Sequence, residues 1–259
     1  MKAVKLLPLS LRLMLVTLMV CWGALTRADV IVGIAPIPPY GIQHGSLENG
    51  IEPQIIHYAF ATQGVDVSFE SMRSKDLPGK LLSQEVNAIV LLENRPYPTL
   101  MGVTVYQSRP LIAFQNSALT LTESGTTVNS ISELSGKRVV AFSGAKQKLG
   151  AEFKLVVEAD GTLYRERKSQ LTQLKVLFGK RYDVMIADKR IAQYWLDYAH
   201  KNNLLPQKNT MNGLTITEII EPEWRVLKFS SAKLQQTFDK GLATIKQNGA
   251  YDKIIAGYQ

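Results

Sequence analysis

A short apolar pattern that occurs twice is the feature that most constrains the fold of this chain. Residues 86–95 read Val-Asn-Ala-Ile-Val-Leu-Leu-Glu-Asn-Arg, and residues 182–190 read Tyr-Asp-Val-Met-Ile-Ala-Asp-Lys-Arg. Each run is typical of a buried strand in a parallel sheet, and each ends abruptly in charged residues. Ligands of open α/β sheets lie beyond the carboxyl ends of the strands, so the pattern places Arg95 and Asp188 at two such edges. A cation and an anion that face one crevice could hold a small molecule carrying both charges.

The first 28 residues predict export. Basic residues precede an apolar core at 13–20, and the small residues Thr26 and Ala28 stand where a signal peptidase reads the chain. This order is typical of a secretory signal peptide, and the apolar core is short for a membrane span. We therefore expect cleavage after Ala28 and a periplasmic mature protein. An uncleaved anchor, or a lipoprotein formed through Cys21, is the alternative.

Removal of this segment changes the charge and the cysteine content. The full chain has 30 Lys and Arg against 22 Asp and Glu, and residues 1–28 contain four of the basic residues and no acidic ones, so the formal net charge falls from +8 to +4. The remaining basic residues are scattered rather than clustered with aromatic side chains, which argues against a nucleic-acid partner. Cys21 is the one cysteine of the chain. The mature protein would therefore have neither a disulfide nor thiol chemistry.

Strand and helix patterns alternate along the mature chain. The order from residue 29 to residue 92 is β-α-β-α-β, which is the mark of a parallel layered sheet. An extended run at 105–115 reads as one long strand that could cross between two lobes, and the pattern then restarts. Ser169 and Asp188 are each placed to cap a helix that follows. About 230 residues suffice for one large domain or for two lobes of roughly 100 residues each.

Six stretches in order along nearly the whole mature chain carry a family resemblance. Pro-Pro-Tyr at 38–40 resembles a Pro-Pro-aromatic loop, and Ile-Ser-Glu-Leu-Ser-Gly-Lys-Arg-Val-Val-Ala-Phe-Ser-Gly at 131–144 closely resembles a second motif. The other four stretches lie at 50–52, 93–106, 182–188 and 234–254. In these stretches the chain resembles the family 3 extracellular solute-binding proteins, the periplasmic components of polar amino-acid transporters.

The fold that this resemblance implies is α/β, with the two lobes of a periplasmic binding protein joined by a two-stranded hinge. Each lobe would be a mixed, mostly parallel sheet flanked by helices, and the lobes would close around a ligand by rotation at the hinge. The expected boundaries are 29–108 plus 226–259 for lobe 1, 112–222 for lobe 2, and 106–111 and 221–226 for the hinge.

The resemblance also implies a binding site in the cleft. Arg95 matches the arginine that binds a ligand carboxylate through two parallel N–H donors, and Asp188 matches the aspartate that binds the ammonium. From the residues alone, Arg95 could equally be a surface arginine and Asp188 a helix N-cap. The turn at 143–146 could offer backbone N–H groups to the carboxylate, and Tyr40 could cover the ligand or pack against the hinge. The expected ligand-binding residues are Tyr40, Arg95, Ser143, Gly144, Ala145, Lys146 and Asp188.

We expect the protein to capture a small polar, carboxylate-bearing ligand, an amino acid or a relative of one. Its partner would be an inner-membrane ABC permease or a sensor, and we expect a monomer without cofactor or metal. Several residues depart from the family pattern: Ala145 stands where a threonine is usual, and Arg73 and Lys75 stand where an aromatic lid is frequent. Together these departures favour a different ligand, an acidic one in view of Arg73, Lys75 and Lys146, or a sensor role without a transporter.

Two other functional classes remain open. Dehydratases of cyclohexadienyl acids and glycan-cleaving lytic enzymes share the implied scaffold, and both need a cleft carboxylic acid for proton transfer, for which Glu93 is the candidate. A single glutamate in a loop is more often solvated than catalytic, so we expect no enzymatic activity. The histidines show no metal-ligand spacing, and neither a phosphate loop nor Gly-x-Ser-x-Gly is present. A partner-binding protein that has lost its ligand is the other alternative.

Overall fold

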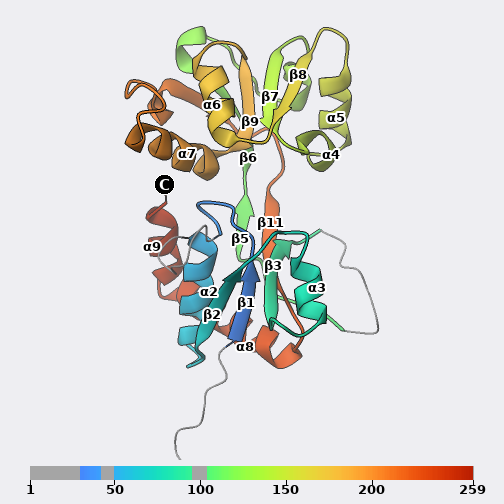
Figure 1. Cartoon of the computed structure of the whole chain (residues 1–259), viewed down its shortest axis with the longest axis vertical. Helices are drawn as coiled ribbons and strands as arrows, with labels where there is room; N and C mark the ends of the chain where they lie inside the picture. The colour runs from blue at the N-terminus through green and yellow to red at the C-terminus, as the bar shows by residue number, and fades with distance from the viewer. Residues whose placement is uncertain (1–29, 42–49, 95–103, 259) are drawn as a thin grey trace, which may run out of the picture.

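The chain forms two lobes stacked one above the other (Figure 1). The computed structural model describes residues 30–41, 50–94 and 104–258. The predicted signal peptide and Arg95 therefore lie outside the described residues. None of the helices in the described parts of the chain is both long and apolar enough to cross a membrane.

The first lobe is built on a six-stranded sheet that combines the beginning and the end of the chain. Its strands are β1 (Val30–Ile34), β2 (Val67–Ser71), β3 (Ala88–Leu92), β4 (Tyr106–Gln107), β5 (Ile112–Phe114) and β11 (Glu223–Phe229). The order is β2-β1-β3-β11-β4, and β5 also pairs with β11. β1 is parallel to β2 and β3, whereas β11 is antiparallel to β3, β4 and β5. The sheet is therefore mixed.

Helices cover both faces of this sheet because the buried strands are apolar on both sides. Along β1, Val30, Val32 and Ile34 face one core cluster, and Ile31 packs against another. The first cluster joins the sheet to α2 (Ile51–Ala61), α8 (Ala232–Gln247) and α9 (Ala250–Ala256), and the second joins it to α3 (Leu77–Leu82).

The second lobe has the same plan with a five-stranded sheet. Its strands are β6 (Asn116–Leu121), β7 (Arg138–Phe142), β8 (Leu163–Arg167), β9 (Val184–Asp188) and β10 (Leu214–Thr217), in the order β10-β6-β9-β7-β8. The helices α4 (Ala145–Lys148) and α5 (Ala151–Glu158) join one core cluster with this sheet, while α6 (Gln170–Phe178) and α7 (Lys189–Lys201) join another. The short 3-10 helices lie at 122–124, 131–134 and 211–213.

The repeated pattern occupies equivalent places in the two sheets. It forms β3 in the first lobe and β9 in the second. Each of these strands has a parallel neighbour on one side, β1 or β7, and an antiparallel neighbour on the other, β11 or β6. Since β11 and β6 are the strands next to the junction of the lobes (Figure 1), both copies end close to that junction.

Two chain segments join the lobes. Gln115 links β5 to β6, and residues 218–222 link β10 to β11. The expected single strand at 105–115 is wrong: it is divided into β4 and β5, because Pro110 has no N–H to donate and the Arg109 N–H is bound by the Asp239 carboxylate. Residues 106–111, expected at the hinge, therefore run along β11 inside the first lobe, and the crossing lies a few residues later.

The close contact between α2 and α8 in the first lobe depends on Gly241. A Cβ built on Gly241 of α8 would lie 2.0 Å from the backbone oxygen of Ala59 in α2. No real Cβ approaches a backbone oxygen so closely, so α2 and α8 would have to separate.

Gly241→Ala is expected to lower the free energy of unfolding by about 2 kcal/mol, because overpacking against the backbone costs about 3 kcal/mol and the helix propensity of alanine returns about 1 kcal/mol. Gly79→Ala is the matched control, since a Cβ there meets nothing within 4 Å. That variant should be neutral or slightly more stable in urea denaturation. Equal stabilisation by both substitutions would contradict the close approach of α2 and α8.

Candidate functional site

A cavity of about 530 Å³ lies at the junction of the lobes, in the size range of small-molecule sites. The first lobe lines it with residues after the carboxyl ends of β1, β2 and β3, among them Ile37, Ser74 and Glu93. The second lobe contributes Gln147 and Lys148 of α4. The remaining wall comes from the strands at the crossing, through Phe114, Glu223, Trp224 and Arg225. Both lobes and both crossing strands therefore meet at one hollow.

Asp188 lies next to the crossing segment but does not line this cavity. Its carboxylate accepts hydrogen bonds from the Ile191 N–H (3.0 Å), the Gln115 N–H (2.8 Å) and the hydroxyl of Tyr40 (2.8 Å). The Asp188 residue is 2% exposed. The N-cap prediction for Asp188 is confirmed, and the carboxylate has three donors from the chain itself.

Tyr40 connects the two lobes. It follows β1 in the first lobe, is fully buried, and its hydroxyl is also 3.3 Å from Nη1 of Arg190 in the second lobe. Its ring packs edge-on against Phe114, with 4.5 Å between centroids. Of the two predicted places for Tyr40, the structure therefore has it packed beside the hinge.

Burial controls the ionisation of this pair. Burial raises the pKa of Tyr40, and the Asp188 carboxylate raises it further. Burial also raises the pKa of Asp188, although the donors from Ile191, Gln115 and Tyr40 oppose this shift. The hydroxyl of Tyr40 is thus held in its protonated, donating form.

The turn at 143–146 binds a carboxylate of the chain. The N–H groups of Gly144 and Lys146 donate to the two oxygens of Glu166 at 2.6 and 3.0 Å, and the Tyr164 hydroxyl donates at 2.9 Å. Partial burial raises the pKa of Glu166, but these hydrogen bonds outweigh it and hold the pKa below its usual value. The turn has the anion-binding geometry predicted from the sequence, with Glu166 as the anion.

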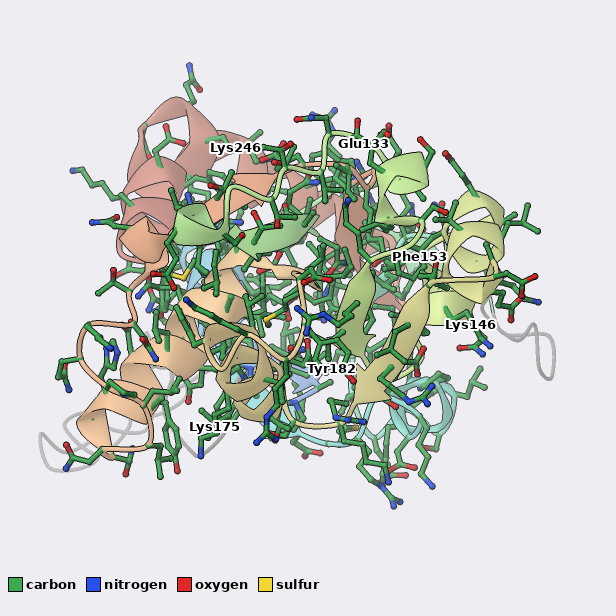
Figure 2. The ribbon with its side chains drawn as sticks, turned by 90° about the horizontal axis from the view of Figure 1, so that it is seen from above. Glu133, Lys146, Phe153, Lys175, Tyr182 and Lys246 are labelled. Carbon is green, nitrogen blue, oxygen red and sulfur yellow. The ribbon has the colours of Figure 1, made fainter. Side chains whose placement is uncertain are left out.

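The three cations that favoured an acidic ligand do not line the cavity, although their sequence neighbours Ser74 and Gln147 do. Arg73 forms an ion pair with Asp76 at 2.6 Å, and Lys146 forms one with Glu158 at 2.8 Å. Figure 2 shows Lys146 at the outer edge of the molecule. Lys75 does not line the cavity either, so an acidic ligand would have to be recognised by other residues.

Sequence reasoning identified one cavity carboxylate, Glu93, and missed the other. Glu93 accepts a hydrogen bond from the Gln107 amide at 3.1 Å. Glu223 accepts one from the Asn116 amide at 3.2 Å, and burial raises its pKa while Lys148 and Arg225 lower it. Glu223 was missed because it is the first residue of β11, whose sequence resembles that of any other antiparallel strand. No group of three potential metal ligands occurs among residues 30–41, 50–94 and 104–258.

An ion pair lies under the cavity wall. Nε and Nη2 of Arg225 contact the two carboxylate oxygens of Glu52 at 2.6 and 3.2 Å, and both residues are buried. The guanidinium also lies 4.9 Å from the ring centroid of Phe114. The charge of Arg225 is therefore matched inside the first lobe.

Solved structures resemble this chain over most of its length. A polar amino-acid ABC uptake transporter substrate-binding protein from Streptococcus thermophilus has 17% identity and a TM-score of 0.64, covering 89% of this chain and 85% of its own. An ancestral arginine-binding protein bound to glutamine has 20% identity and a TM-score of 0.58, covering 90% and 98%. A histidine kinase sensor domain similar to periplasmic binding proteins has 16% identity and a TM-score of 0.61, covering 90% and 96%.

These neighbours confirm the fold predicted from the sequence. The chain has the two-lobed fold of periplasmic binding proteins, with two mixed sheets flanked by helices. No family model and no curated protein matches the sequence.

Proposed function

We propose that this protein is an exported solute-binding protein that captures a small polar ligand between its two lobes. The observation that carries the proposal is the cavity of about 530 Å³ to which both lobes and both crossing strands contribute. A ligand that contacts both walls favours the closed arrangement by its differential affinity for that state. Rotation about Gln115 and residues 218–222 would open and close the cavity.

The cellular setting belongs to the same proposal. Residues 1–28 would direct export and be removed after Ala28, leaving a monomeric protein in the periplasm. The ligand would pass to an inner-membrane ABC permease or be reported to a sensor. Solved neighbours of both kinds, a transporter substrate-binding protein and a histidine kinase sensor domain, support these two possibilities.

Arg95 is our candidate for binding a carboxylate of the ligand from the first lobe. It directly follows Glu93 and Asn94, which line the cavity. A guanidinium there could make two charge-assisted hydrogen bonds, which contribute about 1.5–3 kcal/mol each. Of the other expected residues, Tyr40 and Asp188 would act at the hinge, and the turn at 143–146 would support the second lobe.

The test is to identify the small molecule that co-purifies with the mature protein and then to measure binding and closure. We expect a small polar molecule by native mass spectrometry, a rise in melting temperature when it is added back, and a smaller radius of gyration by X-ray scattering. Arg95→Ala should weaken binding at least tenfold, which corresponds to about 1.4 kcal/mol. A protein that neither retains nor responds to any small molecule would contradict the proposal.

An enzymatic function is the alternative to solute binding, and detectable catalysis would establish it. Glu93 and Glu223 both line the cavity, so a carboxylic acid is available there. Incubation with prephenate or peptidoglycan should leave these substrates unchanged. Turnover that Glu93→Gln abolishes would establish an enzyme instead.

A further inference from the structure

Among the described residues that line the cavity, one cation has no ion pair. Arg225 and Lys148 are the two basic residues among the described lining residues. Arg225 is paired with Glu52, whereas Lys148 makes no ion pair within 4.0 Å among the described residues. The ammonium of Lys148 lies over the ring of Phe142, 5.9 Å from its centroid, and has no carboxylate partner among the described residues. It can therefore still bind an anionic group in the cavity.

Lys148 also has the position that a closing contact needs. It lies at the end of α4 in the second lobe, while Glu93 and Asn94 line the cavity from the first lobe. An anionic group bound by Lys148 in a ligand that also contacts the first lobe would link the two lobes. Because such a link exists only when the lobes are close together, it favours closure.

The backbone donors of the same turn are not available for this role. The N–H groups of Gly144 and Lys146 are bound by Glu166. These bonds also fix the turn from which α4 begins. Of the two residues of α4 that line the cavity, Gln147 and Lys148, only Lys148 carries a charge.

Glu223 is the competitor of any anion at Lys148. The two residues line the same cavity and act on each other electrostatically, but they are not within ion-pair distance. Without a ligand, Lys148 is attracted to Glu223. A bound carboxylate of the ligand would compete with Glu223 for the ammonium of Lys148.

We propose that Lys148 is the ligand-binding residue of the second lobe and that it receives a carboxylate of the ligand in the cavity. This inference rests on the proposed solute-binding function and names the chemical group that Lys148 would recognise. It also implies that Glu223 weakens the binding of anionic ligands, because it competes for the same ammonium.

The test compares ligands that differ in the carboxylate. Glutarate and arginine are the carboxylate-bearing probes, and glutaramide and agmatine are their counterparts without the carboxylate. Titration calorimetry on the mature wild-type protein should give binding of at least one carboxylate-bearing probe about tenfold tighter than its counterpart. Lys148→Met should reduce this preference several-fold, because the methionine side chain has nearly the length of the lysine without its charge; the contribution of Arg95 would remain. Lys154→Met, which removes an exposed lysine of α5 outside the cavity, should leave the preference unchanged.

A second pair of variants tests the competition. Glu223→Gln should strengthen glutarate binding several-fold, whereas Glu221→Gln, which removes an exposed carboxylate outside the cavity, should not. Binding of a carboxylate-bearing probe that Lys148→Met leaves unchanged would overturn the inference while the proposed function stands. Closure around another ligand, with no binding of glutarate or arginine at millimolar concentration, would also overturn the inference alone. The absence of any ligand or closure would overturn both.

Discussion

Replacing Glu52 by glutamine is expected to lower the free energy of unfolding by about 3–5 kcal/mol, because it leaves the buried guanidinium of Arg225 without its counter-charge. The two side chains are 0% and 5% exposed, and their atoms approach to 2.6 Å. Glu52 lies in the first turn of α2 and Arg225 on β11, so the pair fastens the start of a helix to a strand from the other end of the chain. Urea denaturation monitored by circular dichroism measures the loss.

The double variant Glu52→Gln, Arg225→Met is the control for this prediction. Removing both charges avoids the isolated buried cation, so the double variant should recover much of the lost stability. The exposed pair of Arg73 and Asp76 gives the other comparison, since Asp76→Asn should cost at most about 1 kcal/mol. A similar small cost for Glu52→Gln would mean that water reaches the guanidinium of Arg225. The cavity wall would then carry a second unmatched cation beside Lys148.

The parts of the fold that the sequence predicted are those specified by local patterns. A few neighbouring residues suffice to predict each of these features. They are the two apolar runs that form β3 and β9 and the helix caps at Ser169 and Asp188. The interruption of 105–115 was missed although Pro110 was visible. Its position depends on the binding of the Arg109 N–H by Asp239, 130 residues away.

The candidate site was predicted less completely, because its partners come from distant segments. The turn at 143–146 was expected to bind an anion, but nothing local indicates that Glu166 supplies it. Likewise, the sequence places Asp188 at a strand end without showing that Tyr40, 148 residues earlier, donates to its carboxylate. Residue types identified donors and acceptors, whereas the fold determined which of them are already used within the chain.

Asp188→Ala is expected to lower the free energy of unfolding by about 2–4 kcal/mol in the absence of ligand. Loss of the N-cap of α7 contributes about 1 kcal/mol, and leaving the buried hydroxyl of Tyr40 without its acceptor contributes about 1–3 kcal/mol more. Asp188 can be interpreted as a ligand-binding residue or as a structural one, and the two interpretations predict different losses in the free energy of unfolding. A carboxylate reserved for a ligand would cost little stability when removed, whereas one that joins the lobes through Tyr40 would cost much.

Two comparisons isolate the contact between the lobes. Ser169→Ala removes an ordinary N-cap, in which the serine hydroxyl accepts a hydrogen bond from the Thr172 N–H at 3.3 Å, and should cost about 1 kcal/mol. Tyr40→Phe in the Asp188→Ala background should then cost less than Tyr40→Phe alone, because the hydrogen bond between them is already lost. Asp188→Ala could lower the free energy of unfolding no more than Ser169→Ala does, with the effects of Tyr40→Phe and Asp188→Ala simply additive. In that case Tyr40 does not hold the lobes together. Strong coupling would mean instead that the hydrogen bond between Tyr40 and Asp188 stabilises the contact between the two lobes.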